Sequence, residues 1–390
     1  MTNKNRKVDT IARYSPLEIP KIIRAHWNAE PKVPANFIAE PSTVKSEGAL
    51  QTAKELSKES GREFFNWNRR KMADKRIAID APEKYFIFAD LRASETDIGE
   101  LRLQEMHTED DFITFKYNIL FKVLSQDDAK GILFFDEMNL APNMIKAQFY
   151  KIINDRAVGD IPIADGVLCL SAGNESEHAR GVTDDPVPLV LRRGNYFLRP
   201  LLPEEYTDYA AKTGHHKHIL GYLGFRETDV HRIQYNLPDS VGQPCPRTWT
   251  KLSSILKANP NLSIDDVRMV ATGLIGQATA NTFTAFVKSA KKVDVDAIIK
   301  KPSLIREYES QEDNISLVWA IIGEIVARFS DGKDVAKAAA QISLEFEKPE
   351  FGTYLLRSMK AVDKNKFSKK FGSLDEMDAV VDRYAKFMFD

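Results

Sequence analysis

Two adjacent carboxylates, Asp136 and Glu137, follow directly on four apolar residues at positions 132–135. Such a run is typical of a buried parallel strand, and the carboxyl end of that strand opens into the crevice where α/β sheets bind their ligands. Neighbouring carboxylates at this edge are costly unless a cation lies beside them, and Mg²⁺ with a nucleotide triphosphate is the commonest reason for the pair. This interpretation requires a phosphate-binding loop elsewhere in the same sheet.

A candidate for that loop lies near the N-terminus. Residues 35–39 form a short apolar segment typical of a strand, and apolar residues recur at helical spacing from residue 47 onward. The connection between them ends in Lys45 and Ser46. In a phosphate-binding loop, backbone N–H groups surround the phosphates, the lysine meets the β- and γ-phosphates, and the hydroxyl binds Mg²⁺.

The two glycine positions of such a loop hold other residues. Against the pattern G-x-x-x-x-G-K-[ST], Ala39 and Val44 stand where the glycines are expected. The Cβ of Val44 disfavours a positive φ and crowds an approaching phosphate. Either the loop has an altered curl or it binds nucleotide weakly.

Other polar groups could act on the same ligand. A second apolar run, residues 167–172, leads to Asn174, which could hold a water for attack on a phosphate or could simply cap a turn. Arg192 and Arg193 are expected to end a helix, where arginines also complement the helix dipole.

Composition narrows the class of protein. The chain has 390 residues, which is more than one ordinary core holds, and its 43% hydrophobic and 28% charged residues are typical of a soluble globular protein. Lys and Arg number 55 against 56 Asp and Glu, so no basic excess favours a protein that coats nucleic acid. Cys169 and Cys245 lack metal-ligand spacing, which favours a reducing, cytoplasmic setting. No segment approaches the ~18 apolar residues of a membrane span.

Other segments supply the expected frame of the site. A strand is predicted at 85–89, an insertion at 91–105 and a helix at 112–124, while residues 158–166 read as a tight hairpin. Beyond Pro200 helical periodicity dominates to the end of the chain. We therefore predict an α/β domain over residues 1–200, a helical lid over 201–302 and a C-terminal helical region over 303–390.

A histidine cluster at positions 215, 216 and 218 resembles a metal-binding tract only superficially. No carboxylate or cysteine is spaced to complete a site, so a solvated loop is the preferred interpretation.

Taken together, these features resemble AAA+ ATPases and, within them, the MoxR-like branch. The resemblance covers about residues 17–290 and rests on the order of three motifs at residues 135–142 (Phe-Asp-Glu-Met-Asn-Leu-Ala-Pro), 171–174 (Ser-Ala-Gly-Asn) and 246–253 (opening Pro-Arg-Thr-Trp). It implies an α/β fold, the AAA+ αβα sandwich with a central parallel sheet, followed by an α-helical lid and an additional C-terminal helical region. It also implies ATP and Mg²⁺ as ligands.

The resemblance assigns roles to the residues of the predicted loop and strand tip. Lys45 corresponds to the Walker A lysine, Ser46 and Asp136 to the Mg²⁺ ligands, and Glu137 to the base that polarises the attacking water. The segment that corresponds to the rest of the nucleotide-binding loop comprises Ser42, Thr43, Val44 and Glu47.

Further roles fall on residues outside the loop. Asn174 is similar to sensor 1, and Arg247 to sensor 2, which reaches the γ-phosphate from the lid. Arg192 and Arg193 both stand where the family carries its arginine finger, and the resemblance does not choose between them. Such an arginine acts on the nucleotide of a neighbouring subunit, so a ring, usually a hexamer, is implied.

The implied function is that of a cytoplasmic ring ATPase that couples ATP hydrolysis to remodelling of a protein partner. Relatives often act with proteins that carry a von Willebrand factor A domain, so such a partner is expected. An alternative is a McrB-like motor that acts on DNA, although the near-neutral net charge disfavours nucleic acid. Another alternative is a structural or adaptor ring that hydrolyses ATP weakly or not at all. The presence of Val44 in the loop is the feature that supports this alternative. Retention of both acids and Asn174 favours a slow or conditional ATPase.

Overall fold

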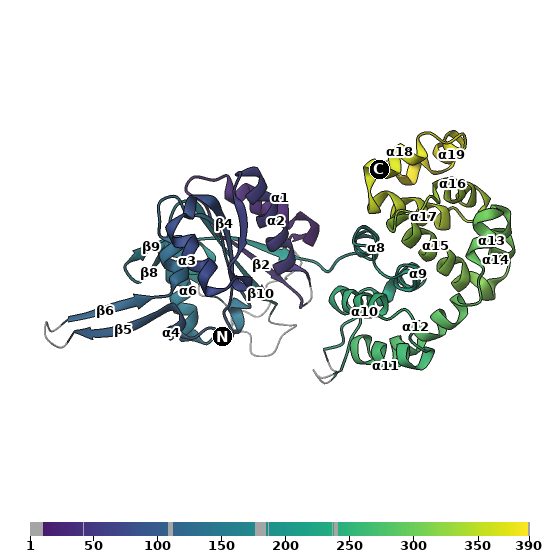
Figure 1. Ribbon diagram of the computed structural model, residues 1–390. Coiled ribbons are helices and arrows are strands. Elements are labelled where there is room, and N and C mark those ends of the chain that lie inside the picture. The colour runs from purple at the N-terminus through teal and green to yellow at the C-terminus, as the bar shows by residue number, and fades with distance from the viewer. Residues whose placement is uncertain are drawn as a thin grey trace. The chain divides into compact units, whose positions relative to one another are not determined.

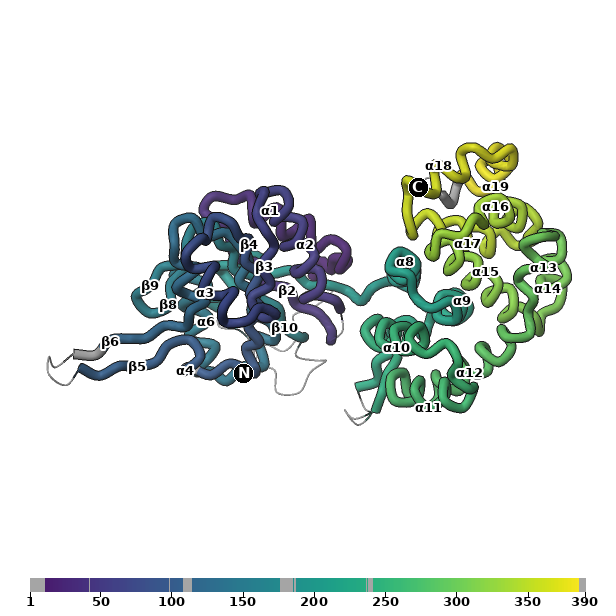
Figure 2. Tube along the Cα trace, viewed as in Figure 1, coloured from purple at the N-terminus to yellow at the C-terminus, as the bar shows by residue number. Residues whose placement is uncertain are grey.

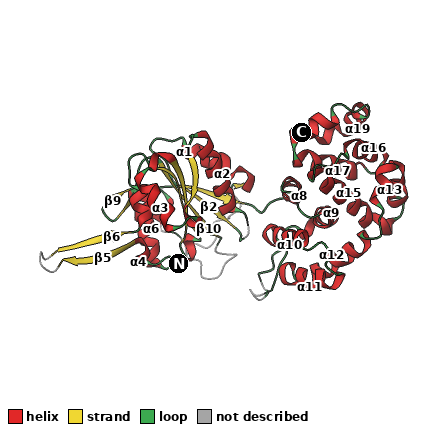
Figure 3. Ribbon diagram, in the orientation of Figure 1, coloured by secondary structure: helices red, strands yellow, loops and turns green. Residues whose placement is uncertain are grey.

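The computed structural model describes residues 11–41, 43–107, 112–175, 185, 187–235, 237 and 241–388. The chain forms two compact units, residues 1–200 and residues 201–390 (Figure 1). Strands lie only in the first unit among the described residues, and the second unit consists of helices and their connections (Figure 3).

A parallel sheet forms the centre of unit 1. Within the described residues it has seven strands in the order β1-β11-β2-β10-β7-β4-β3, and every neighbouring pair is parallel. β10 therefore lies between β2 and β7. The strands are β1 (Arg13–Tyr14), β2 (Ala35–Ala39), β3 (Glu63–Asn66), β4 (Tyr85–Arg92), β7 (Lys130–Asp136), β10 (Val167–Asn174) and β11 (Gly194–Leu198).

Helices cover both faces of this sheet. On one face α1 (Ile19–Trp27) and α2 (Lys45–Glu59) share a core with alternate residues of β7, among them Ile132 and Phe134. On the other face α3 (Met72–Asp80), α5 (Ile119–Leu124) and α6 (Asn143–Asp155) pack against the intervening residues Leu133 and Phe135. Because the strands are buried on both sides, they read as continuous apolar runs. The predicted α/β class, with helices on both faces of a parallel sheet and a helical part after it, is confirmed.

A β-hairpin replaces part of the helix that the sequence predicted at 112–124. β5 (Arg102–His107) pairs antiparallel with β6 (Phe112–Tyr117), and the helix α5 begins only at Ile119. The two strands extend away from the sheet of unit 1 (Figures 1 and 2). The prediction was wrong because residues 112–117 are rich in β-branched and aromatic side chains, which favour a strand. A short helix, α4 (Ile98–Leu101), precedes the hairpin.

Two other predictions near the site have different outcomes. The tight hairpin expected at 158–166 is confirmed by β8 (Ala157–Val158) and β9 (Ile161–Pro162). The helix expected to end in the arginine pair is shorter than predicted, since α7 (Val187–Val190) stops before Arg192 and β11 begins at Gly194. The aromatic residues after Gly194 pair with β2 as a further strand of the sheet.

Unit 2 is a stack of helices that bury one another's apolar stripes. α15 packs against α9 and α17, and α17 packs against α8, so helices on both sides of residue 303 share one compact unit. Within the described residues, none of the helices has the length and apolar character needed to cross a membrane. The helices are α8 (Pro203–Lys212), α9 (Lys217–Phe225), α10 (Pro246–Ala258), α11 (Ile264–Ile275), α12 (Gln277–Ala290), α13 (Val295–Lys300), α14 (Ile305–Glu309), α15 (Ile315–Ser330), α16 (Ala336–Glu345), α17 (Pro349–Val362), α18 (Lys364–Phe371) and α19 (Met377–Met388).

Candidate functional site

The loop between β2 and α2 brings a buried lysine to the carboxyl edge of the sheet. Lys45 is the first residue of α2 and is only 7% exposed. Its Nζ donates to the Asn174 side-chain oxygen at 3.1 Å and to the carbonyls of Ala39 and Glu40, each at 3.2 Å. The lysine is thus joined to Asn174 at the end of β10, because that residue lies in register with Ala39 at the end of β2.

Val44 adopts the backbone conformation that the loop requires in spite of its side chain. Its φ is 50° and its ψ is 24°, which is the left-handed region. A β-branched residue rarely occupies this region, and the strain marks the position where a phosphate-binding loop carries glycine. The loop therefore has the left-handed turn before the lysine, and a Cβ stands where the pattern has none.

The other residues of the predicted loop are placed differently. Thr43 is buried, and its hydroxyl donates to the Glu40 carbonyl, which ties the loop to itself. Glu47 is exposed and accepts a hydrogen bond from Gln51 along α2, so no contact joins it to the residues of the site described here. Ser42 lies outside the described residues.

Ser46 and Asp136 form the second link across the site. The Ser46 hydroxyl donates to one Asp136 carboxylate oxygen at 2.5 Å, while the other oxygen accepts from the backbone N–H of Glu137 at 2.9 Å. Asp136 follows Phe134 in the alternation of β7 and so lies on the face that α2 covers. A hydroxyl and a carboxylate oxygen are both ligand types that Mg²⁺ prefers.

Glu137 leaves the strand in a left-handed conformation, with φ of 55°. Its carboxylate accepts a hydrogen bond of 2.7 Å from the hydroxyl of Ser94, which follows β4. Ser94 was missed by sequence reasoning, since it lies in the polar stretch interpreted as an insertion. No signal in the sequence distinguishes it from the other polar residues there.

Asn139 fixes the end of β10. Its side-chain oxygen accepts from the Asn174 N–H at 3.1 Å, and its amide nitrogen donates to the Asn174 carbonyl. The neighbouring residue is Gly173, where an added Cβ would lie 2.9 Å from the Asn139 side chain. The asparagine of the Asp-Glu-Met-Asn motif therefore positions the side chain that bonds Lys45, and it needs a glycine beside it.

The two candidate arginines differ in environment. The Arg193 side chain is 1% exposed, pairs with Asp185, and donates to the Ser171 hydroxyl at 3.2 Å. Burial lowers the pKa of this guanidinium, and the charge of Asp185 opposes that shift. The Arg192 side chain is 59% exposed, and its nearest carboxylate, Asp155, lies 4.0 Å away. Arg193 is therefore held inside unit 1, and Arg192 is presented to solvent.

Arg247 belongs to unit 2, where it occupies the first turn of α10 and is exposed. The helix itself begins at Pro246. The assignment of Arg247 to sensor 2 stays a prediction.

The histidine cluster of unit 2 is not a solvated loop. His215 is 6% exposed and bonds the hydroxyls of Thr213 and Thr250, while His216 caps the start of α9. Burial lowers the pKa of His215 and His216 to about 4 and that of His218 to about 3, with nearby lysines adding to the effect. The expectation of a solvated loop was wrong because residue types were considered without the helices that pack over them.

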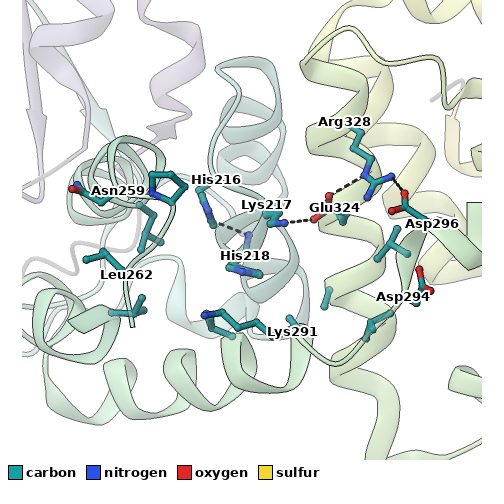
Figure 4. Close-up of a pocket in the computed structure, with 18 residues that line it drawn as sticks. His216, Lys217, His218, Asn259, Leu262, Lys291, Asp294, Asp296, Glu324 and Arg328 are labelled. Carbon is teal, nitrogen blue, oxygen red and sulfur yellow. Dashed lines mark hydrogen bonds and ion pairs between the residues drawn. The ribbon is translucent and has the colours of Figure 1, made fainter. Parts of the chain in front are cut away.

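Two of these histidines line a cavity of about 460 Å³ in unit 2 (Figure 4). Four of the charged residues on its wall form ion pairs. Lys217 lies 2.7 Å from Glu324, and Arg328 lies 2.5 Å from Asp296. Across the part of the chain that the structure describes, no group of three or more His, Cys, Asp or Glu residues could hold a metal ion.

Comparisons with known proteins add little to this description. The sequence matches no family model and no curated protein. Among solved structures, the chain is similar to the crystal structure of a putative ATPase from Cytophaga hutchinsonii, with 10% sequence identity and a TM-score of 0.31. That alignment covers 95% of this chain and 89% of the other. A likeness at this level carries no weight for function, so the proposal below rests on the fold and the site.

Proposed function

We propose that this protein is a Mg²⁺-dependent ATPase of the AAA+ class, of the MoxR-like branch. The observation that carries the proposal is the direct linkage of four predicted residues from three separate segments. Lys45 bonds Asn174, and Ser46 bonds Asp136. The order of strands explains this meeting, because β10 with Asn174 lies between the loop after β2 and the acids after β7.

The residues present fit ATP and Mg²⁺ by their chemistry. The start of α2 offers backbone N–H groups and the Lys45 ammonium to phosphate, which helix N-termini bind readily. Ser46 and Asp136 offer hard oxygen ligands to the metal. When bound, Mg²⁺ would neutralise charge on the phosphates.

Each residue of the site has its own proposed role in hydrolysis. Lys45 exchanges its carbonyl partners for phosphate oxygens, and Asn174 remains at the end of β10 to orient a water. Glu137 takes the proton of that water, and the Ser94 hydroxyl holds the Glu137 carboxylate until then. Of the two arginines, Arg192 is the proposed finger, because a residue that acts on a neighbouring subunit must be exposed.

The finer functional proposal follows from the family resemblance. We propose a cytoplasmic homo-oligomeric ring, a hexamer, that remodels a protein partner such as one with a von Willebrand factor A domain. The exposure of Arg192 supports assembly, since its side chain is 59% exposed and the carboxylate with which it pairs among the described residues, Asp155, lies 4.0 Å away. A DNA motor remains the second enzyme candidate, and the balanced charge of the chain disfavours it.

One observation favours a different class of function. The Val44 Cβ lies in the turn that phosphate must approach, so a structural or adaptor ring with little hydrolysis is the competing proposal. The retained contact between Ser94 and Glu137 supports hydrolysis, because a ring with no catalytic role has no need of an oriented base.

Phosphate release from ATP tests the proposal. The wild-type protein with Mg²⁺ should release phosphate, and Glu137→Gln should reduce the rate by about 10²–10⁴-fold while nucleotide binding persists. Glu95→Gln is the matched control, because Glu95 is an exposed acid that pairs with Arg92. Stimulation by DNA at low salt would favour the motor, and ATP binding without turnover would favour the adaptor ring.

A further inference from the structure

A third carboxylate lies beside the predicted metal ligands, on the neighbouring strand. Asp90 is in register with Phe134 of β7, and Arg92 is in register with Asp136. Phe86 and Phe88 share the core beneath α2, and Asp90 continues their alternation along β4. Asp90 and Asp136 therefore lie on the same face of the sheet, one step apart on adjacent strands.

The Asp90 carboxylate is incompletely satisfied. Its Oδ1 atom is buried and has no hydrogen-bond partner among the described residues. Burial and the charge of Asp136 together raise the pKa of this carboxyl to about 6. An unpaired buried oxygen of an acid is costly, and native proteins retain one where a function or an ion accounts for it.

The backbone of Asp90 is held in place by Asn68. The Asn68 side chain accepts from the Asp90 N–H at 2.8 Å and donates to the Asp90 carbonyl at 2.6 Å. β3 ends at Asn66, so these two bonds continue the pairing of β4 where the strand partner has stopped. The backbone position of Asp90 is therefore fixed by the fold.

The adjacent cationic side chain does not satisfy this acid. Arg92 is exposed and bonds Glu95 at 3.2 Å. The charges of Asp136 and Glu137 thus raise the cost of ionising Asp90. A divalent cation would remove that cost.

We propose that Asp90 is an additional acidic residue of the divalent-cation site, alongside Ser46 and Asp136. This inference rests on the proposed nucleotide site. The ligand of Asp90 is a hard divalent cation, Mg²⁺ or Mn²⁺, in the presence of nucleotide. The unpartnered Asp90 oxygen serves the cation's coordination or its hydration shell.

Mn²⁺ titration of the full chain with a non-hydrolysable ATP analogue tests this proposal. Free Mn²⁺ is followed by its electron paramagnetic resonance signal. Asp90→Asn should weaken Mn²⁺ binding by about tenfold, as removal of a supporting group does in other metal sites. Glu95→Gln should leave the Mn²⁺ affinity unchanged, and Asp136→Asn should weaken it more than Asp90→Asn does.

A second readout separates this role from a structural one. In the absence of metal and nucleotide, Asp90→Asn should raise the melting temperature, because the substitution removes a carboxylate that burial and Asp136 disfavour in its charged form. A structural acid would lose stability instead. Higher stability of the free protein together with weaker Mn²⁺ binding supports the proposal.

Other results overturn it. Mn²⁺ affinity of Asp90→Asn equal to that of Glu95→Gln, with the analogue still bound, contradicts the inference alone. Failure of the wild-type protein to bind the analogue, with or without Mn²⁺, contradicts the proposed function and this inference with it.

Discussion

The two units differ in where their backbones leave the ordinary regions of φ and ψ. Among the described residues, the non-glycine residues with positive φ are Val44, Glu137 and Arg156, and all belong to unit 1. In unit 2 positive φ falls only on glycines, at positions 214, 276 and 332. Two of the strained residues of unit 1 flank the candidate site, one before Lys45 and one after Asp136.

This contrast indicates that unit 1, and not unit 2, has conformations that its stability alone does not explain. Strain of about 1–3 kcal/mol per residue persists only where the surrounding structure enforces it, and such residues gather at functional sites. Unit 2 meets the same need for tight turns with glycine, which bears no such cost. Unit 1 therefore keeps strained backbone conformations beside the polar residues at its strand ends, whereas the described residues of unit 2 show no such strain.

The largest predicted effect separates the two arginines of unit 1. Arg193→Ala should destabilise unit 1 by about 3–5 kcal/mol, because it leaves Asp185 without its buried partner. Arg192→Ala should leave stability within about 0.5 kcal/mol and lower ATP turnover only in the assembled protein. Urea unfolding and phosphate release measure the two effects. Equal destabilisation by both substitutions would contradict the assignment of Arg192 to the finger.

Acid should weaken unit 2 through its buried histidines. Their folded-state pKa values, about 4 for His215 and His216 and about 3 for His218, lie below the unfolded value of ~6.5. The folded state therefore binds fewer protons, so stability is complete above pH 6.5 and is lost as pH falls toward 4. We expect a loss on the order of 2 kcal/mol, allowing for partial exposure.

Hydrogen exchange of the α9 amides at pH 7 and pH 5 measures this effect. His218→Gln cannot take up a proton in that range and should flatten the dependence. Protection of α9 that is equal at both values would show that the histidines are protonated without cost.

The smallest predicted effects come from one substitution that relieves backbone strain in unit 1 and one that introduces it in unit 2. Val44→Gly should stabilise unit 1 by ~0.5–1 kcal/mol, since relief of the left-handed strain exceeds the added entropy of the unfolded chain. Gly276→Ala should destabilise unit 2, because the φ of 76° is unfavourable to alanine and its Cβ would lie 2.6 Å from the Gly242 carbonyl oxygen. Thermal unfolding measures both changes. Nucleotide affinity should rise in Val44→Gly, and an unchanged affinity would mean that Val44 does not face phosphate.

Part of this arrangement could be predicted from sequence. Mostly apolar runs leading to Asp136 and Asn174 identified strands and their polar tips, because parallel strands are buried on both faces. The position of Val44 in the loop pattern anticipated the strained turn. These inferences succeeded because local residue types alone determine them.

Other features depend on contacts between distant segments. Asn139 belongs to a recognised motif, but its clamp on Asn174 requires the register of β7 and β10. Ser94 and Asp90 gave no local signal, since each becomes notable only beside the end of β7. Likewise, Arg193 differs from Arg192 in its burial, and the sequence of two adjacent arginines does not show which of them is buried.

Calorimetric titration of ATP with Mg²⁺ into the wild-type protein and into Lys45→Ala tests the central claim most directly. Lys54→Ala on the same helix is the matched control, because its ammonium lies over the Phe64 ring and away from the site. The wild-type protein and Lys54→Ala should bind with equal affinity, and Lys45→Ala should bind at least about tenfold more weakly, as expected for loss of a hydrogen bond from a charged donor. Absence of binding by the wild-type protein at millimolar ATP, or equal binding by Lys45→Ala, would contradict the account.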